Sequence, residues 1–379
     1  MTQIELPGVA LVLLFAADHE MASGFAARWL GGLTAPDEAA ARLATRALVA
    51  VDAGPATRDQ LTRLARAATG AYARVYAVAV ETNADLVARR LGTIPVMERF
   101  AVAPGTEVAV QLRPVSTDRR GESGPFDIVG DVHGCADELT LLLDKLGYRV
   151  AFAGTGDARR VTVTPPTGRR AFFAGDLVDR GPNSPDVLRI AMTMVADGSA
   201  LCIAGNHDVA CLRWLDGKAV HLSHGLADTA AQLAAEPPAF REQVRAFIAN
   251  LKGHLWVDGG RLAVAHAGVQ EAMIGRSTGR VRAFSLYGDT GNKPAADGLP
   301  MRYHWALDYR GETAVVYGHT PVAGAAWVNN TLCIDTGCCF GGRLTALRWP
   351  EREIVSVPAL ATYTTRGRAF GHPPGRPKR

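Results

Sequence analysis

Five short turns of this chain carry the residue types from which a metal site is built. Each turn sets aspartate, asparagine or histidine beside glycine, and the turns are Gly130–Gly134, Gly175–Gly181, Gly205–Asp208, His266–Gly268 and Gly318–Thr320. Carboxylate, imidazole and amide oxygen together suit manganese, iron or zinc rather than calcium. The glycines let the backbone turn sharply and approach a metal closely. Five such turns in one chain predict a metal site.

The turns must be positioned by β-strands, because each follows a short apolar segment. These segments are Phe126–Gly130, Ala171–Ala174, Leu201–Ala204, Arg261–Ala265 and Ala314–Tyr317. In α/β folds the functional side chains collect at the ends of strands. We therefore expect the five turns to converge.

A simpler interpretation exists for each of these residues taken singly. The aspartates and the asparagine precede helical stretches and could be N-caps, and the histidines could be core or turn residues. Capping explains neither the histidines nor Arg180, so the set as a whole favours a functional site. Four further histidines have no accompanying motif and are interpreted as structural: His221, His224, His254 and His304.

From about Pro125 to Pro358 the chain resembles the calcineurin-like metallophosphoesterases, and more closely the phosphatase module of bacterial polynucleotide kinase-phosphatase. Besides the turns, the stretches Gly275–Gly288, Tyr317–Pro321 and Val328–Gly342 carry this resemblance. It implies an α/β fold with a two-sheet αββα core, preceded by a small P-loop-kinase-like α/β domain.

The resemblance also implies two divalent metal ions that share one carboxylate, Asp176. Manganese is the first choice, with iron, zinc, nickel and cobalt as alternatives. The implied ligands are Asp131, His133 and Asp176 for one ion, and Asp176, Asn206, His266 and His319 for the other.

Such an arrangement is suited to attack on phosphorus. Two cations about 3.5–4 Å apart lower the pKa of a shared water and present hydroxide to the substrate. Arg180 can donate two hydrogen bonds to phosphate oxygens. His207 is placed to protonate the leaving alkoxide, and Asp208 is expected to orient it. The resemblance places an acidic residue near the site in the stretch that contains Asp335.

Two other features near these turns were considered for a role in the reaction. Arg276 and Arg280 are candidates to bind the substrate, although a solvated loop explains them equally well. Cys338 and Cys339 have no accompanying base, so a nucleophilic cysteine is not expected.

Residues 1–115 are predicted to form a separate small α/β unit with a parallel sheet, because short apolar strands alternate with Ala-rich helical stretches. The predicted strands are Val9–Ala16, Ala47–Val51 and Ala73–Val80, and the predicted helices are Ala22–Leu30, Arg58–Ala68 and Asn83–Leu91. A polar linker, Ser116–Gly124, follows. Residues 125–360 then form the metallophosphoesterase domain with a helical insertion at 209–251, and 361–379 form a basic tail.

In the resembled kinase-phosphatase, a P-loop would follow the first strand of this front unit. Here Ala16–Ser23 lacks both glycines and the lysine of that motif and contains two acidic residues. Like charges would repel a polyphosphate. We therefore expect a kinase-like fold that does not bind ATP and serves as a scaffold or positions the substrate.

Composition and charge bear on the cellular compartment in which the protein is expected. The 379 residues carry a net charge of +4, and the longest apolar run, Pro7–Ala17, is too short to span a bilayer. Glu5 precedes that run without any lysine or arginine, which argues against a secretory signal. The six cysteines form no CxxC pair and are expected to be reduced thiols in a cytoplasm. The tail could contact a polyanion or remain a loose terminus.

The predicted function is hydrolysis of phosphomonoesters, and in addition of phosphodiesters, on nucleotides or nucleic-acid ends. A protein serine/threonine phosphatase and a dinucleoside polyphosphate hydrolase are alternatives, because the same metal turns serve all three. A non-catalytic regulatory protein is a further alternative, against which the complete ligand set with Arg180 and His207 argues. No membrane partner is expected, and a homo-oligomer stays open.

Overall fold

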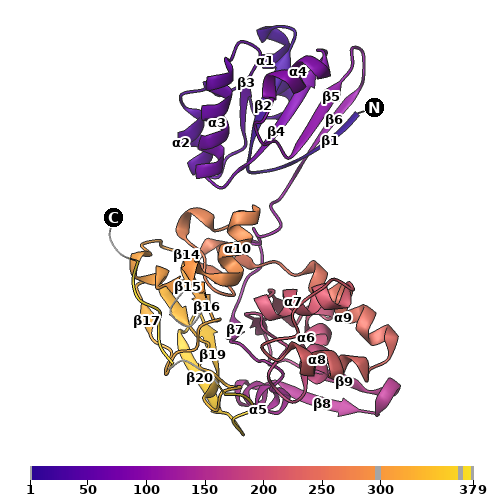
Figure 1. The fold of residues 1–379 in the computed structure, drawn as a ribbon, viewed down its shortest axis with the longest axis vertical. Helices are drawn as coiled ribbons and strands as arrows, with labels where there is room; N and C mark the ends of the chain where they lie inside the picture. Colours follow the sequence, from indigo (N-terminus) through magenta and orange to yellow (C-terminus); the bar gives the residue numbers. More distant parts are fainter. Residues whose placement is uncertain (1, 295–299, 366–369, 377–379) are drawn as a thin grey trace. The chain divides into compact units, whose positions relative to one another are not determined.

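The computed structural model describes residues 2–294, 300–365 and 370–376 and divides the chain into two compact units. The first unit contains residues 1–118 together with 275–281, and the second contains 119–274 and 282–379. Figure 1 labels their helices and strands. Part of the predicted basic tail, 366–369 and 377–379, lies outside the described residues.

The first unit is an α/β unit with a four-stranded parallel sheet in the order β3-β2-β4-β5, as the alternating pattern predicted. A separate parallel pair, β1-β6, was not predicted. The strands are β1 (Thr2–Pro7), β2 (Ala10–Ala16), β3 (Val49–Asp52), β4 (Arg74–Val80), β5 (Glu98–Val102) and β6 (Val108–Arg113). The helices are α1 (His19–Trp29), α2 (Ala39–Ala44), α3 (Arg58–Gly70) and α4 (Ala84–Leu91).

Strand β2 explains why this sheet is covered on both faces. Successive side chains of a strand point to opposite faces. Leu11 and Leu13 pack in one buried cluster with residues of α2, α3 and α4, whereas Val12 and Leu14 pack in another with residues of α1 and β1. A continuous apolar run is what a strand buried on both faces requires.

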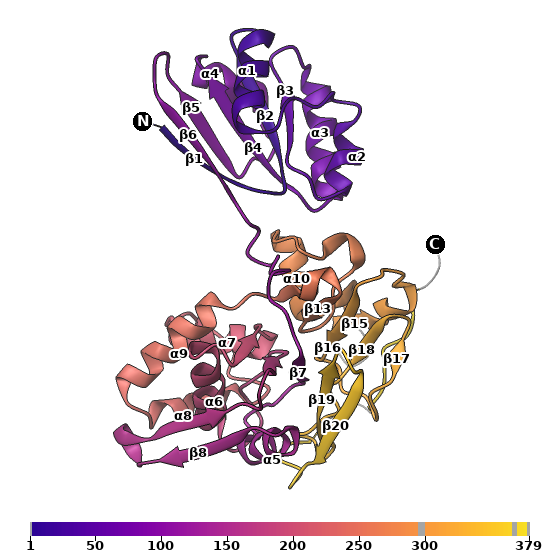
Figure 2. The same cartoon turned by 180° about the vertical axis from the view of Figure 1, so that it is seen from behind.

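The second unit contains two five-stranded mixed sheets, seen from opposite sides in Figures 1 and 2. The first sheet has the order β11 (Ala200–Cys202), β10 (Arg170–Phe173), β7 (Phe126–Val129), β19 (Arg343–Trp349) and β20 (Glu353–Pro358). The second has the order β12 (His254–Val257), β13 (Leu262–Ala265), β16 (Ala314–Tyr317), β18 (Thr331–Cys333) and β17 (Trp327–Val328). Two separate antiparallel pairs join β8 (Arg149–Ala153) to β9 (Arg160–Thr164) and β14 (Asp289–Pro294) to β15 (Pro300–Tyr303).

The helices of this unit lie mainly on the first sheet. They are α5 (Ala136–Leu146), α6 (Ser184–Ala196), α7 (Asn206–Leu215), α8 (Leu226–Ala234) and α9 (Pro238–Asn250). A further helix, α10 (Gly279–Tyr287), begins in the segment 275–281 of the first unit and continues into the second unit. Short 3-10 turns are η1 (Gly156–Ala158), η2 (Asp258–Gly260), η3 (Glu271–Met273) and η4 (Trp305–Asp308). The predicted helical stretch 209–251 corresponds to most of α7 with α8 and α9.

Apolar side chains from both sheets form the core between them. Phe126 and Phe172 of the first sheet meet edge to face with ring centroids 5.9 Å apart, and Val264 and Val316 of the second sheet belong to the same buried cluster. Residues of α5, α6, α8 and α9 cover the outer face of the first sheet. On the outer face of the second sheet, Trp305 of η4 packs on Tyr317. The layers therefore follow the predicted αββα order, with residues of α10 and the short turn η4 on the second sheet.

Other predictions can be compared directly with the structure. Near the C-terminal end of the second unit, β19 and β20 form an antiparallel pair. The six cysteines, all within the described residues, are free and buried. Within 2–294, 300–365 and 370–376, no helix has the length and apolar character needed to cross a membrane.

Candidate metal centre

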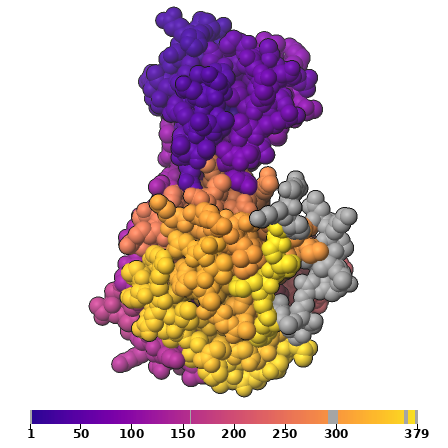
Figure 3. All heavy atoms as spheres, turned by 90° about the vertical axis from the view of Figure 1, so that its left-hand side faces the viewer, coloured from indigo at the N-terminus to yellow at the C-terminus, as the bar shows by residue number. Residues whose placement is uncertain are grey.

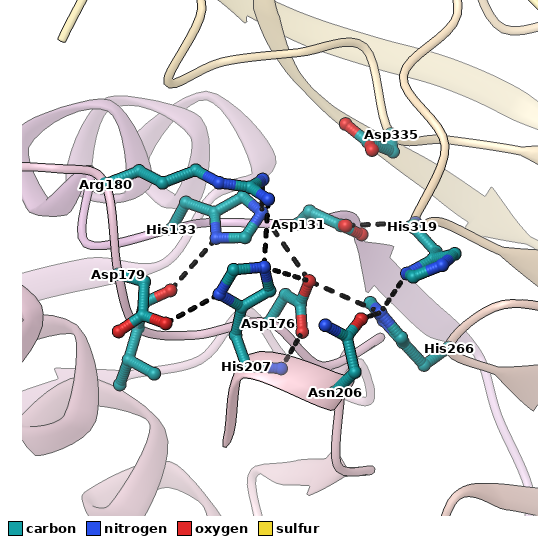
Figure 4. A network of polar contacts seen from close by, with 12 residues as sticks. Asp131, His133, Asp176, Asp179, Arg180, Asn206, His207, His266, His319 and Asp335 are labelled. Atoms are coloured by element: carbon teal, nitrogen blue, oxygen red, sulfur yellow. Dashed lines mark hydrogen bonds and ion pairs between the residues drawn. The ribbon is translucent and has the colours of Figure 1, made fainter. Parts of the chain in front are cut away.

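The ends of parallel strands from both sheets supply the predicted ligands. Strands β7, β10 and β11 run parallel in the first sheet, and β13, β16 and β18 run parallel in the second. The carboxyl ends of parallel strands lie at one edge of a sheet. Five of the predicted metal ligands follow these strand ends in the chain, and their side chains face one another in Figure 4: Asp131, Asp176, Asn206, His266 and His319.

Asp176 lies at the centre of this cluster. Its Oδ2 is 3.5 Å from His133 Nε2, 3.3 Å from His266 Nε2 and 4.0 Å from His207 Nε2. Two sets of three residues could each hold a metal, and Asp176 belongs to both: one adds His133 and His207, and the other adds His266 and His319. The structure thus brings two potential metal positions to a single carboxylate.

The second position is completed by short contacts among the remaining ligands. His266 Nε2 is 3.1 Å from Asn206 Oδ1 and 3.1 Å from His319 Nδ1. The backbone N–H of His319 donates to Asp131 Oδ2 at 2.9 Å. The six residues predicted as metal ligands are therefore brought together by the fold.

Unsatisfied polar atoms test whether the cluster fits a cation. Asp131 Oδ1 and His319 Nε2 are buried, and neither has a hydrogen-bond partner within the described residues. Burying such atoms without a partner is unfavourable. A cation would satisfy the carboxylate oxygen of Asp131, and two groups of Asp and His side chains lie close enough together to hold one, so the residues fit divalent metal ions.

Backbone geometry at the site requires two of the glycines. A Cβ atom at Gly205 would collide with Asp176 Oδ1, and one at Gly318 would collide with Asp131 Oδ1. Asp176 and His133 themselves have positive φ values of 49° and 48°. Such conformations are uncommon for residues other than glycine and cluster at functional sites. The glycines of the sequence pattern thus allow the carboxylates to approach the backbone.

Backbone carbonyls orient two of the imidazoles. His133 Nδ1 lies 2.9 Å from the carbonyl oxygen of Val178, and His266 Nδ1 lies 3.1 Å from that of Ala174. A proton on each Nδ1 would be donated to the carbonyl, which leaves Nε2 with its lone pair facing Asp176. Both rings are held in the orientation that a metal ligand needs.

The electrostatics of the cluster suit cation binding. Burial lowers the pKa of His133 and of His319 well below the ordinary value, so both rings are neutral at pH 7. Burial alone would raise the pKa of Asp176, but the imidazoles of His266, His207 and His133 together hold it well below its ordinary range. Neutral imidazoles and an ionised carboxylate are the forms that ligate metals.

His266 behaves differently, because it faces two carboxylates. Burial lowers its pKa, but Asp176 and Asp131 outweigh this effect and raise the pKa to about 9. In the metal-free protein His266 is therefore protonated at neutral pH. A metal must displace this proton, so its affinity is expected to rise with pH.

His207 is oriented by Asp179 and not by Asp208, which corrects the sequence prediction. His207 Nδ1 is 2.6 Å from Asp179 Oδ2. The two carboxylate oxygens of Asp208 instead accept from the backbone N–H groups of Leu177 at 3.0 Å and Gly205 at 2.8 Å. Asp208 thus caps α7 and fastens the neighbouring loop. Asp179 was missed, although it stands in the same turn as Asp176.

The side chain of Arg180 extends to the cluster and contacts both His133 and His207 (Figure 4). Its Nη1 is 2.6 Å from His133 Nε2, and its Nη2 is 2.9 Å from His207 Nε2. The guanidinium carbon also lies 5.1 Å from the ring centroid of Phe340. A forked donor is thereby held beside the candidate metal ligands.

Asp335 stands apart from the contact network in Figure 4. It is buried, and its Oδ1 accepts from the N–H of Gly337 at 3.0 Å. Burial raises the pKa of Asp335 to about 6, and its charge in turn raises the pKa of Asp131. It is therefore close enough to influence the cluster electrostatically.

The two other arginines considered as substrate contacts have partners in the first unit, to which residues 275–281 belong. Arg276 is buried, and its Nη2 donates to the carbonyl of Leu43 at 2.8 Å. Arg280 lies over the ring of Tyr72 at 5.3 Å. The sequence pattern gave no sign of these contacts, and the substrate role of both residues stays a prediction.

The fold and this cluster are those of a metallophosphoesterase. A family model described as calcineurin-like phosphoesterase matches residues 124–346, and the chain belongs to this family. The family expected from the sequence is thus confirmed.

Two relatives with similar sequences carry the name bis(5′-nucleosyl)-tetraphosphatase PrpE (asymmetrical). The one from Anoxybacillus flavithermus is 41% identical over 242 residues, which are 63% of this chain and 96% of that protein. The one from Geobacillus thermodenitrificans is 44% identical over 238 residues, 62% of this chain and 94% of that protein. A solved protein serine/threonine phosphatase from Saccharomyces cerevisiae aligns with TM-score 0.44 and 13% identity over 66% of this chain and 84% of that one. These relatives do not support the narrower likeness to polynucleotide kinase-phosphatase.

Replacing Asp176 tests its place in both metal positions. We expect Asp176→Asn to reduce bound manganese from about two ions per chain to fewer than one, because both positions lose a shared anionic ligand. Elemental analysis after dialysis measures this directly. Asp144→Asn, a change at an exposed aspartate of α5, is the matched control. Loss of only one ion would show that Asp176 is not shared.

The pair Asp179→Asn and Asp208→Asn separates orientation of His207 from capping of α7. Asp179→Asn should lower kcat about 10- to 100-fold, because the imidazole of His207 loses the carboxylate that orients it. Asp208→Asn should mainly lower the free energy of unfolding by about 1–3 kcal/mol, since it removes a buried acceptor. Kinetics and urea unfolding of both variants check the assignment. The reverse pattern would return the orienting role to Asp208.

Proposed function

We propose that the protein hydrolyses dinucleoside polyphosphates, cleaving a bis(5′-nucleosyl) tetraphosphate asymmetrically into a nucleoside triphosphate and a nucleoside monophosphate. The observation that carries the proposal is the shared carboxylate of Asp176, which allows two cations to act on one phosphate group. The tetraphosphatase relatives, which this chain covers almost completely, support the substrate class.

The predicted metal ligands would hold two divalent ions. By the family resemblance, one ion would be held by Asp131, His133 and Asp176, and the other by Asp176, Asn206, His266 and His319. The geometry supports His133 with Asp176 for the first ion, and Asp176 with His266 and His319 for the second. Divalent ions bound there supply Lewis acidity and an activated water; manganese is our first choice.

Arg180 and His207 would act on the substrate itself. The guanidinium of Arg180 presents two donors and can bind two oxygens of the attacked phosphate. His207, buried and held by Asp179, can give its proton to the oxygen of the leaving group. The buried carboxylate of Asp335 is proposed to tune this region through its charge rather than by a direct contact.

The first unit is proposed to be a scaffold that does not bind ATP. Asp18 caps α1, and its side chain accepts from the N–H of Met21 at 2.8 Å. A phosphate at that helix end would need the same backbone donor and would meet the negative charge of Asp18. This arrangement supports the expectation drawn from the altered P-loop sequence.

A substrate panel with the full-length protein and manganese tests the proposal. We expect P1,P4-di(adenosine-5′) tetraphosphate to be hydrolysed with a kcat/KM at least about tenfold above that for AMP or a 3′-phosphorylated oligonucleotide, with ATP and AMP as products in equal amounts. Anion-exchange chromatography separates them. Formation of two ADP molecules, or a preference for the oligonucleotide end, would contradict the proposal and favour the other nucleotide substrates.

The acid role of His207 predicts a dependence on the leaving group. His207→Asn should reduce turnover of an alkyl phosphate about 100-fold or more, since an alkoxide needs a proton to leave. Turnover of the tetraphosphate should fall less, because the departing nucleotide phosphate is already a good leaving group. Parallel measurement of kcat for both substrates, with metal content as the control, makes the comparison. Equal losses would remove His207 as the acid.

A further inference from the structure

A cleft of the second unit lies directly beside the metal-ligand cluster. His319 lines it together with Thr320, so the cleft and the cluster share a wall. The cleft is shallow, with about 20 Å³ available to the centre of a water-sized sphere. A ligand whose phosphate is held at the metal ligands could therefore extend into this cleft.

Several aromatic side chains line the cleft. Tyr287, Tyr303, Trp305 and Tyr317 all line it. Trp305 is held firmly, since its Nε1 donates to the carbonyl of Ala267 at 3.1 Å and its ring lies 5.0 Å from that of Tyr317. Tyr287, by contrast, is 45% exposed. Rigid and accessible rings together suit a planar ligand.

His304 gives the cleft a buried polar group. The residue is 7% exposed, and its Nε2 has no hydrogen-bond partner within the part of the chain that the structure describes. Its ring is stacked on that of His372, with centroids 4.0 Å apart and planes 8° from parallel. A buried nitrogen of this kind calls for a polar partner, which an apolar ligand would not supply.

Arg302 adds a positive charge between the cleft and the cluster. It lines the cleft, and its Nη1 donates to Thr320 Oγ1 at 3.3 Å. Thr320 directly follows His319, one of the predicted metal ligands, in the chain. The guanidinium is therefore close enough to the ligand cluster to act on a phosphate that extends from it.

The C-terminal segment 370–376 closes one side of the cleft. His304 donates its backbone N–H to the carbonyl of Pro374 at 2.8 Å, and Gly371 donates to that of Pro321 at 3.0 Å. Arg376 pairs with Asp289, with Nε 3.0 Å from Oδ2, and lies over the ring of Tyr303. In Figure 3, yellow atoms of the C-terminal part of the chain lie directly beside orange atoms of the second unit.

We propose that this cleft binds the nucleoside of the substrate, with its base among Tyr287, His304 and His372 and its phosphate chain beside Arg302. The inference rests on the proposed hydrolysis of a nucleotide substrate and adds where that nucleotide is recognised. A base offers both the flat face that aromatic rings stack on and the polar edge that His304 Nε2 can bond. The C-terminal segment thereby becomes part of the substrate site through His372.

Binding of small ligands to the manganese-loaded, full-length protein tests the cleft without relying on turnover. Isothermal titration calorimetry compares AMP with ribose 5-phosphate, which has the same phosphate but no base. We expect the wild-type protein to prefer AMP, and Tyr287→Ala and His372→Ala each to reduce this preference about tenfold, the size expected for one lost stacking contact. The KM for the dinucleoside tetraphosphate should rise by a similar factor.

His221→Ala, a change at an exposed histidine outside the cleft, is the matched control and should leave the preference unchanged. Equal affinity of the wild type for AMP and ribose 5-phosphate, or an unchanged preference in both cleft variants, would overturn the inference. A preference for AMP that depends on Tyr287 and His372, found in a protein that does not cleave the tetraphosphate, would retain the cleft and reject the proposed function. The two ideas can therefore fail separately.

Discussion

The buried carboxylate of Asp176 is the constraint around which the second unit is organised. An ionised carboxylate with 2% exposure is unfavourable unless opposite charge or strong donors surround it. Here three imidazoles lie within 4.0 Å of Oδ2, and the N–H of His207 donates to Oδ1 at 3.0 Å. The turns that bring these groups must therefore meet at one point. Cations would complete the compensation of charge that the protein groups begin.

This convergence depends on rigid sheets and on strained turns at their edges. Asp176, Asp179, Arg180 and His319 all have positive φ values between 49° and 74°. Such backbone conformations are unfavourable for these residue types and persist where the surroundings enforce them. The apolar core between the sheets provides that support, because buried strands cannot shift without losing packing. The packing that stabilises the fold therefore also holds the side chains of the site in place.

Much of the site could be predicted from the sequence, because its ligands stand in short turns directly after apolar strands. The partner of His207 could not, since Asp179 and Asp208 are both acidic residues near it and only coordinates show which one reaches Nδ1. The surroundings of Arg276 could not be predicted for a related reason. A Gly-rich loop predicts exposure, whereas this loop belongs to the first unit and the guanidinium bonds to a backbone carbonyl there. Contacts between distant segments leave no local pattern.

The same distinction separates the chemistry of the protein from its specificity. Metal ligands need particular side chains at particular turns, so their types and spacing are visible in the sequence. The proposed nucleoside cleft needs only rings and one polar nitrogen, which three distant segments supply at Tyr287, His304 and His372. Each of these residues alone resembles an ordinary structural residue, and His304 was interpreted as one. A metal centre common to a family can therefore be joined to different substrate clefts without any change in the motif that identifies it.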